Sequence, residues 1–151
     1  MILLSASSLC IISLLIAPKR GLLVRLARMQ LFRFRSKMEN GLKHIWKKPA
    51  SQKELSSFIR FSLRLRGWLT SEGSLTPQGE LQAKKIIRLH RLWEVYLVEC
   101  LGQNVEKVHR TAEELEHLFS PALEKELSEL LNYPLKDPHE QPIPPIPGDP
   151  K

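Results

Sequence analysis

Histidine and acidic residues in the second half of the chain have the types and the spacing of metal ligands. His90 and Glu94 lie four residues apart, so a helix would present both on one face. His109 and Glu113 repeat this spacing further along the chain. Imidazole nitrogens combined with carboxylate oxygens suit Fe²⁺ or Mn²⁺, whereas thiolates favour Zn²⁺ or Cu(I). The pattern therefore predicts a site for one of these two ions.

Glu116 and His117 extend the second group of candidate ligands. At about 100° per residue, His109, Glu113 and Glu116 fall in a narrow sector of one helix, and His117 lies beside it. Two simpler interpretations stay open. The same spacing occurs on solvated helices, and a histidine on an apolar face is often a core residue.

A helical region is expected to position these side chains. The apolar spacing predicts helices over residues 78–101, 105–118 and 120–131. The first and the last of these are expected to form the core of a homodimer, in which Trp93 and Leu97 become buried. From Tyr133 onward the proline content excludes a helix or a central strand.

A winged helix-turn-helix is predicted before this region. Its order of helix, helix, helix and two-stranded wing is typical of modules in which the third helix enters the major groove of double-stranded DNA. The expected helices span 39–48, 52–57 and 58–66, and the expected strands span 68–70 and 75–76. The side chains expected to contact DNA are Arg60, Arg64 and Arg66. A merely solvated basic face is the alternative.

The first 38 residues carry the excess positive charge of the chain. The net charge is +7, and the seven cations before Glu39 are accompanied by no acidic residue. Ile2–Ala17 is apolar and ends at Pro18. A spanning helix needs about 20 such residues. Cations that follow an apolar segment place the rest of the chain in the cytoplasm, and residues 19–38 suit an anionic membrane surface.

Several classes of protein are excluded by composition. With 151 residues the chain has room for one domain with appendages, and 42% hydrophobic residues exclude disorder throughout. Two cysteines cannot build a disulfide framework, which favours a reducing compartment. Motifs for phosphate loops, dinucleotide binding, serine hydrolases and H-E-x-x-H metallohydrolases are absent from the sequence. We therefore expect no enzyme.

Three stretches of the chain resemble one family. RLHRLWEVYLVECLG, EKVHRTAEELEHLFSPALEKELSELLNYP and DPHEQPIPP are similar to the metal-dependent repressors of the diphtheria-toxin-repressor family, over roughly residues 39–145. The resemblance implies an ancillary metal site and a primary regulatory site between DNA-binding and dimerisation elements. It assigns His90, Glu94 and His109 to the ancillary site, and Glu113, Glu116, His117 and Asn40 to the primary site.

The sequence also departs from this family. Asn40 is a weaker oxygen ligand than the Met or Asp expected there, and Lys43 stands where manganese-responding members have a second Glu. This lysine argues against a two-manganese centre of that type. About ten residues are missing between Ser57 and Gly67, which shortens or displaces the recognition helix.

The segment IAPKRGLLVRLARM resembles the end of the last transmembrane helix of manganese, iron and zinc ABC-transporter permeases. Together with the repressor-like part, this resemblance implies the C-terminal portion of a permease–repressor fusion of the chlamydial type. Its expected parts are a transmembrane-like segment, a basic linker, a winged helix-turn-helix, a metal-binding and dimerisation domain and a proline-rich tail, over 1–18, 19–38, 39–77, 78–133 and 134–151.

The expected function is repression of metal-uptake genes in response to Fe²⁺ or Mn²⁺, by a homodimer on operator DNA. We expect a cytoplasmic domain whose N-terminal segment lies in or at the inner membrane, with release of a soluble form as a possibility. The alternative function is a cytoplasmic regulatory domain of a metal-transporter permease, which senses metal without contacting DNA.

Overall fold

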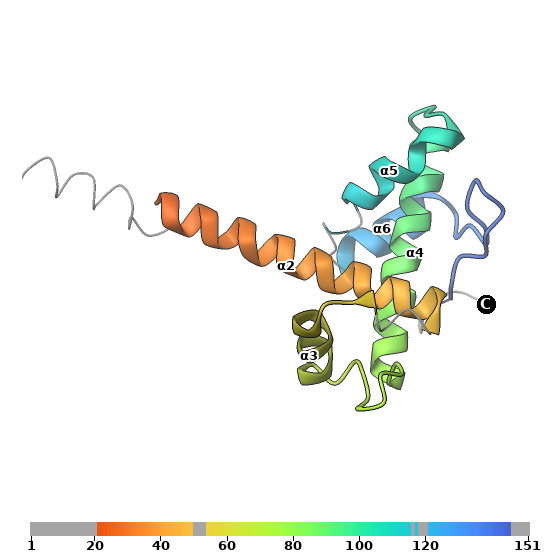
Figure 1. Cartoon of the computed structure of the whole chain (residues 1–151). Helices are drawn as coiled ribbons and strands as arrows, with labels where there is room; N and C mark the ends of the chain where they lie inside the picture. Colours follow the sequence, from red (N-terminus) through yellow and green to blue (C-terminus); the bar gives the residue numbers. More distant parts are fainter. Residues whose placement is uncertain (1–20, 50–53, 116, 118–120, 146–151) are drawn as a thin grey trace, which may run out of the picture. The chain divides into compact units, whose positions relative to one another are not determined.

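The structure is a computed structural model that describes residues 21–49, 54–115, 117 and 121–145. Its described part is mainly helical, as expected (Figure 1). The chain divides into two compact units, Met1–Lys37 and Met38–Lys151. The described helices are α2 (Leu22–Lys47), α3 (Ser57–Leu65), α4 (Pro77–Glu99), α5 (Val105–Leu115) and α6 (Pro121–Leu130).

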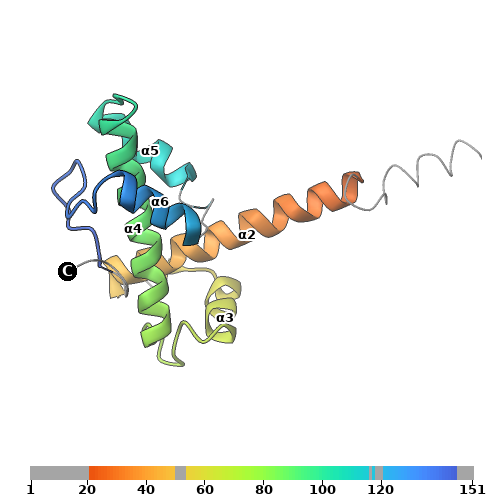
Figure 2. The same cartoon turned by 180° about the vertical axis from the view of Figure 1, so that it is seen from behind.

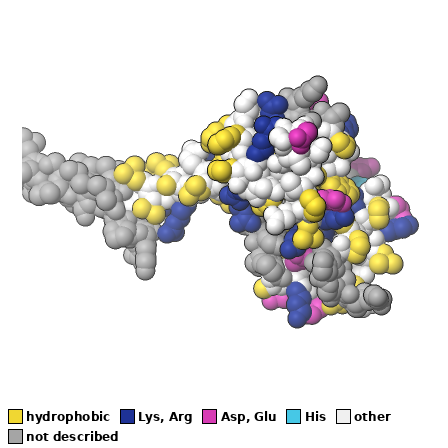
Figure 3. Space-filling view, turned by 90° about the horizontal axis from the view of Figure 1, so that it is seen from below, with side chains coloured by type: hydrophobic (Ala, Val, Ile, Leu, Met, Phe, Trp, Pro, Cys, Tyr) yellow, Lys and Arg dark blue, Asp and Glu magenta, His cyan; other side chains and the backbone are white. Residues whose placement is uncertain are grey.

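Within the first unit, the described residues form the N-terminal part of α2. Its hydrophobic side chains are exposed beside basic ones and without acidic ones (Figure 3). Over residues 21–145, as far as they are described, no helix combines the length and the apolarity needed to cross a membrane. The predicted apolar segment 1–18 lies outside the described residues. The exposed hydrophobic side chains are Leu22, Leu23, Leu26, Met29, Leu31 and Phe32.

The helix expected over 39–48 is the C-terminal part of α2 and is not a separate element. Met38, Leu42 and Ile45 lie on one face of this part and are buried. At Gly41 an added Cβ would lie 3.3 Å from a methyl group of Leu55 and 3.4 Å from Ile59. The missing side chain therefore lets α2 lie close to the start of α3.

The predicted helix over 52–57 and the two predicted strands are wrong in the described residues. Ser56 is the N-cap of α3, because its hydroxyl accepts a hydrogen bond from the Ile59 amide at 3.3 Å. The wing is reduced to one bridge between Leu69 and Leu75, which the turn around Gly73 closes. The two runs expected as strands are only three and two residues long, too short for a ladder.

The helix α4 is central to the second unit, with α5 and α6 beside it (Figures 1 and 2). It begins at Pro77 after the N-cap Thr76, whose hydroxyl accepts a hydrogen bond from the Gly79 amide at 3.0 Å. One apolar cluster joins α4 to α6 and to the segment after it. Its buried members are Leu89, Leu92, Val95, Leu127 and Ile143.

The second apolar cluster joins α4 to α5 and corrects an expectation. Leu97 was expected on the surface that a dimer buries, but it is only 3% exposed within a single chain. It packs against Val108 and Ala112 of α5. A charge at Leu97 would therefore separate α5 from α4 before it could affect a dimer.

The close approach of α4 to the preceding segment generates the first prediction. A Cβ at Gly79 would overlap the carbonyl oxygen of Trp68 and lie 2.9 Å from its carbonyl carbon. We expect Gly79→Ala to lower the free energy of unfolding by about 2 kcal/mol, since backbone has to move to admit the methyl group. Thermal unfolding followed by circular dichroism measures the change. Gln78→Ala, at an exposed neighbouring position, is the control, and an equal effect of both variants would contradict the prediction.

Candidate metal centre

Three of the predicted ligands meet where α4 lies against α5. His109 Nδ1 lies 2.8 Å from Glu94 Oε1 and 2.9 Å from His90 Nε2, and the last two atoms are 3.3 Å apart. His90 and Glu94 are buried, whereas about half of the His109 side chain (53%) is exposed. The structure therefore brings together the residues predicted for the ancillary site, and His109 opens this site to solvent.

The distances within this triangle fit a divalent ion. Metal–ligand bonds of about 2.1 Å at right angles place neighbouring donor atoms about 3 Å apart. The three observed separations, from 2.8 to 3.3 Å, bracket that value. Nitrogen and oxygen donors in this number suit Mn²⁺ and Fe²⁺.

The protons available to these three groups cannot satisfy all of their contacts. If both ring nitrogens carry a proton, the two N–H groups oppose each other at 2.9 Å. If one of them lacks a proton, its lone pair faces a lone pair of the Glu94 carboxylate. While Glu94 is ionised, one contact is thus unfavourable however the two imidazoles are protonated. A cation between the three atoms would make all of them favourable, which is independent support for a metal site.

Glu94 is an ionised ligand over the whole physiological range. Burial by itself would raise the pKa of its carboxyl group. Hydrogen bonds from His90 and His109, and the positive charge of their rings, outweigh burial and lower the pKa to about 2. Glu94 therefore needs no deprotonation before it can bind a metal ion near neutral pH.

A histidine that the sequence analysis did not select lies beside this site. His139 Nε2 is 3.9 Å from Glu94 Oε1. It belongs to a hairpin that Asp137 holds in shape, since one Asp137 oxygen accepts from the His139 amide at 2.8 Å and from the Gln141 amide at 2.9 Å. The hairpin is attached to α4 by an ion pair between Asp137 and Arg91 at 3.3 Å. No periodic pattern could indicate His139, because it lies in a proline-rich loop.

The residues expected for the primary site are only partly together. His117 Nδ1 lies 2.9 Å from the Oε2 atom of Glu39, and both side chains are nearly buried. Glu39 was not among the candidates. Its neighbour Asn40, which was, is exposed. Glu116 lies outside the described residues. Glu39 and Asn40 differ in burial because consecutive residues of a helix point about 100° apart.

Glu113 lies between the two groups of ligands. Its Oε1 atom is 3.9 Å from His109 Nε2 and 3.7 Å from the ammonium nitrogen of Lys43 on α2. The lysine side chain is only 10% exposed. The lysine that the sequence analysis singled out thus contacts a predicted metal ligand.

The arginines expected to contact DNA all contact their own chain. Arg64 donates to the carbonyl oxygens of Thr70 and Ser71 at 3.1 and 2.6 Å, and so attaches α3 to the turn of the reduced wing. The Arg66 guanidinium lies 5.2 Å from the ring centroid of Trp68. Arg60 donates to Ser57 Oγ at 3.3 Å.

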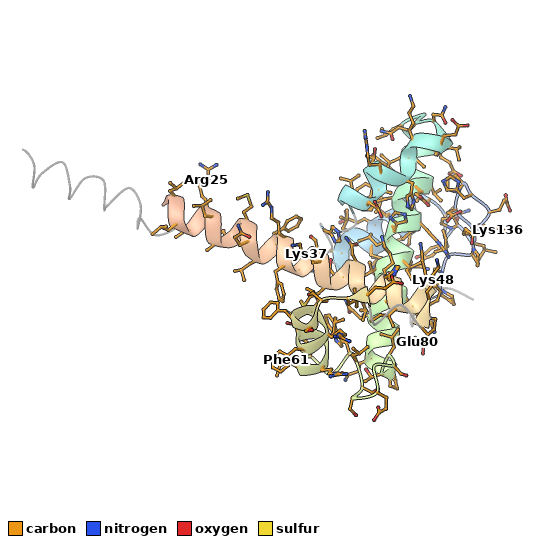
Figure 4. All side chains as sticks on the ribbon, viewed as in Figure 1. Arg25, Lys37, Lys48, Phe61, Glu80 and Lys136 are labelled. Atoms are coloured by element: carbon orange, nitrogen blue, oxygen red, sulfur yellow. The ribbon has the colours of Figure 1, made fainter. Side chains whose placement is uncertain are left out.

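The exposed face of α3 is also unusually apolar for a surface that contacts DNA. Phe58 and Phe61 are about two-thirds exposed and Leu65 is 78% exposed. Phe61 points away from the helix into solvent (Figure 4). Their spacing of three and four residues places the three side chains along one side of the helix.

The part of the chain that contains the triangle is similar to known proteins. Residues 76–145, which contain the whole triangle, match the family model described as the iron dependent repressor, metal binding and dimerisation domain. The match takes in just under half of the chain. The iron-dependent repressor IdeR of Mycobacterium leprae is 40% identical over 70 residues, which are 46% of this chain and 30% of IdeR.

Other relatives extend beyond the repressor domain. A probable metal transport system membrane protein of Chlamydia trachomatis serovar D is 32% identical over 163 aligned residues, which cover 92% of this chain. The chain spans 36% and 38% of the lengths of this protein and of its Chlamydia pneumoniae counterpart.

Solved structures share the fold. A manganese-dependent transcriptional repressor in complex with manganese is 32% identical, with a TM-score of 0.64, and the match covers 74% of this chain and 60% of that one. The manganese regulator SloR is 31% identical with a TM-score of 0.60, over 75% and 61% of the two chains. The names of these relatives are those of regulators and transport proteins and not of enzymes.

The triangle generates the second prediction. We expect His109→Ala to weaken the binding of one Mn²⁺ ion by about 10-fold or more, because one of three ligands is removed. Isothermal titration calorimetry with Mn²⁺ measures the affinity. The control is His44→Ala, since His44 is exposed and contacts Glu54, away from the triangle. Equal Mn²⁺ affinity of the His109→Ala variant and the wild type would remove His109 from the site.

Proposed function

We propose that the chain is a metal-dependent transcriptional repressor, which binds Fe²⁺ or Mn²⁺ and, as a homodimer, double-stranded operator DNA of metal-uptake genes. The observation that carries this proposal is the triangle of His90, Glu94 and His109. It lies inside a domain whose relatives are named iron- and manganese-dependent repressors. A divalent ion bound there would supply the positive charge that joins α4 to α5.

A second metal position is proposed around Glu39 and His117, with Glu113 and Glu116 as further ligands. The pair joins α2 to the residue just beyond α5, 78 positions apart in sequence. A metal ion that strengthens the contact between Glu39 and His117 would also hold α2 in place. The start of α3 packs on α2 at Gly41. Metal binding would thus select one position of α3, so that DNA binding no longer costs the free energy of ordering it.

DNA contact is proposed for the end of α3 and the reduced wing, as a compact winged helix-turn-helix. Arg64 and Arg66 are exposed there, and Arg60 is half-buried. The contacts of Arg64 with Thr70 and Ser71, and of Arg66 with Trp68, would hold these two guanidinium groups in place before DNA arrives.

The N-terminal residues are proposed to attach this repressor to the inner membrane from the cytoplasmic side. The support is the likeness to metal transport system membrane proteins over 92% of the chain. The exposed apolar and basic side chains of α2 in the first unit agree with such a surface.

One alternative function is favoured by a specific observation. The apolar exposed side of α3, made of Phe58, Phe61 and Leu65, is unlike a DNA-reading face. A metal-sensing regulatory domain of an ABC metal transporter, which contacts protein and not DNA, would use such a surface. The two functions differ in whether the chain binds DNA at all.

A DNA-binding measurement separates them and is the third prediction. We expect the full chain in detergent to bind DNA from upstream of its own coding region with Mn²⁺ or Fe²⁺, and at least about 10-fold more weakly with EDTA. Fluorescence anisotropy of labelled DNA measures the affinity. Glu94→Gln should bind weakly in both conditions, because a ligand is lost. If the wild type binds no such DNA at low salt with metal, the transporter-domain function replaces the repressor.

The fourth prediction concerns the basic side chains of α3. We expect Arg60→Ala to weaken DNA binding and to reduce the slope of log affinity against log salt by about 1, since each phosphate contact releases about one counterion. The Mn²⁺ affinity should stay that of the wild type. Arg110→Ala, on α5, is the matched control, and the assignment of α3 fails if both variants behave alike.

A further inference from the structure

Two residues of α2 and two residues of the α5 region form a ladder of charged contacts. Glu39 and Lys43 lie one helical turn apart, and both are buried. Glu39 contacts His117, and Lys43 contacts Glu113, which is itself one turn before His117. This ladder joins the same two elements that the proposed second metal position would join.

Lys43 places a permanent positive charge inside that position. A lysine that is only 10% exposed needs a nearby negative charge, because burying an uncompensated ammonium is very costly. Glu113 Oε1 lies 3.7 Å from its nitrogen atom. The same oxygen is 3.9 Å from His109. Any divalent ion that used Glu113 would thus meet a like charge a few ångströms away.

We infer that Lys43 is a built-in cation, which holds α2 to α5 in the metal-free protein and competes with a divalent metal for Glu113. The inference rests on the proposed function and adds a regulatory residue to it. Lys43 neutralises Glu113 before any metal binds, so the affinity for metal is set lower than the ligands alone would give. Metal then acts by displacing the lysine from this carboxylate.

This inference predicts two changes of opposite direction in one variant. Removing the positive charge weakens the contact between α2 and α5 when no metal is bound. It also raises the affinity for metal of the position that uses Glu113. An ordinary structural ion pair would lose stability and leave the metal affinity unchanged or weaker. A lysine without influence on the site would change neither.

The test uses the full chain with Lys43→Gln, and Lys43→Met as a second variant in case the first does not fold. In EDTA we expect both to unfold roughly 2–5 °C below the wild type. Calorimetry with Mn²⁺ should show at least about 5-fold tighter binding at the position that uses Glu113. Lys43→Arg keeps the charge and should restore both wild-type values. The matched control is Lys84→Gln, since Lys84 contacts Glu80 at 2.7 Å on α4 and should leave the Mn²⁺ affinity unchanged.

The inference is overturned if Lys43→Gln and Lys43→Met bind Mn²⁺ no more tightly than the wild type. That outcome leaves the proposed function intact, provided that the wild type binds Mn²⁺ and that His109→Ala weakens the binding. If the wild type itself binds no Mn²⁺, the proposed function fails and the competition fails with it. The wild-type titration therefore distinguishes the two failures.

Discussion

The convergence of His90, Glu94 and His109 is the constraint on which the rest of this domain depends. It requires α5 to lie against α4 with a defined rotation, because the three donor atoms come within 2.8–3.3 Å of one another. The apolar contact of Leu97 with Val108 and Ala112 supplies that position. The buried carboxylate of Glu94 then organises the two imidazoles around it. Core packing thus brings polar groups together that do not fully satisfy one another, and a cation would relieve this.

Arg88 and Arg91 attach further segments of the domain to α4 in a comparable way. The buried guanidinium of Arg88 contacts Glu124 and Ser128 of α6 and the carbonyl oxygen of Pro144. Arg91 contacts Asp137 and donates to the carbonyl oxygen of Pro142. The proline-rich segment is therefore an ordered part of the domain up to Pro145, and it places His139 beside Glu94.

The contacts between α2 and the α5 region link the proposed second metal position to α3. Glu39 and His117 form a nearly buried pair, and the nearly buried Lys43 contacts Glu113, whose side chain is half exposed. Such pairs respond strongly to a change of charge nearby, since the local dielectric constant is low. Gly41 lies between them on the same helix and contacts Leu55 and Ile59. Under the proposed function, a change at these side chains would reach the start of α3 along α2.

The sequence by itself determined the helices α4, α5 and α6 and the face of α4 on which His90 and Glu94 lie. Apolar spacing placed α4, α5 and α6 within a few residues of their observed ends. The i, i+4 spacing on α4 put His90 and Glu94 on one face, because a helical repeat is a local property. The type of ligand likewise indicated the type of metal. The two predicted strands of the wing are wrong, since a run of two or three residues carries no periodic signal.

Tertiary structure decided which residues meet. The choice between Glu39 and its neighbour Asn40 depends on the rotation of α2 about its axis, and the packing of Met38, Leu42 and Ile45 sets that rotation. Likewise, the side chain of Leu97 packs against Val108 and Ala112 of α5, so the position of α5 decides that Leu97 is buried within the chain. His139 reaches Glu94 only through a loop that Asp137 and Arg91 fold. Such contacts depend on side chains far apart in the sequence, so no local pattern contains them.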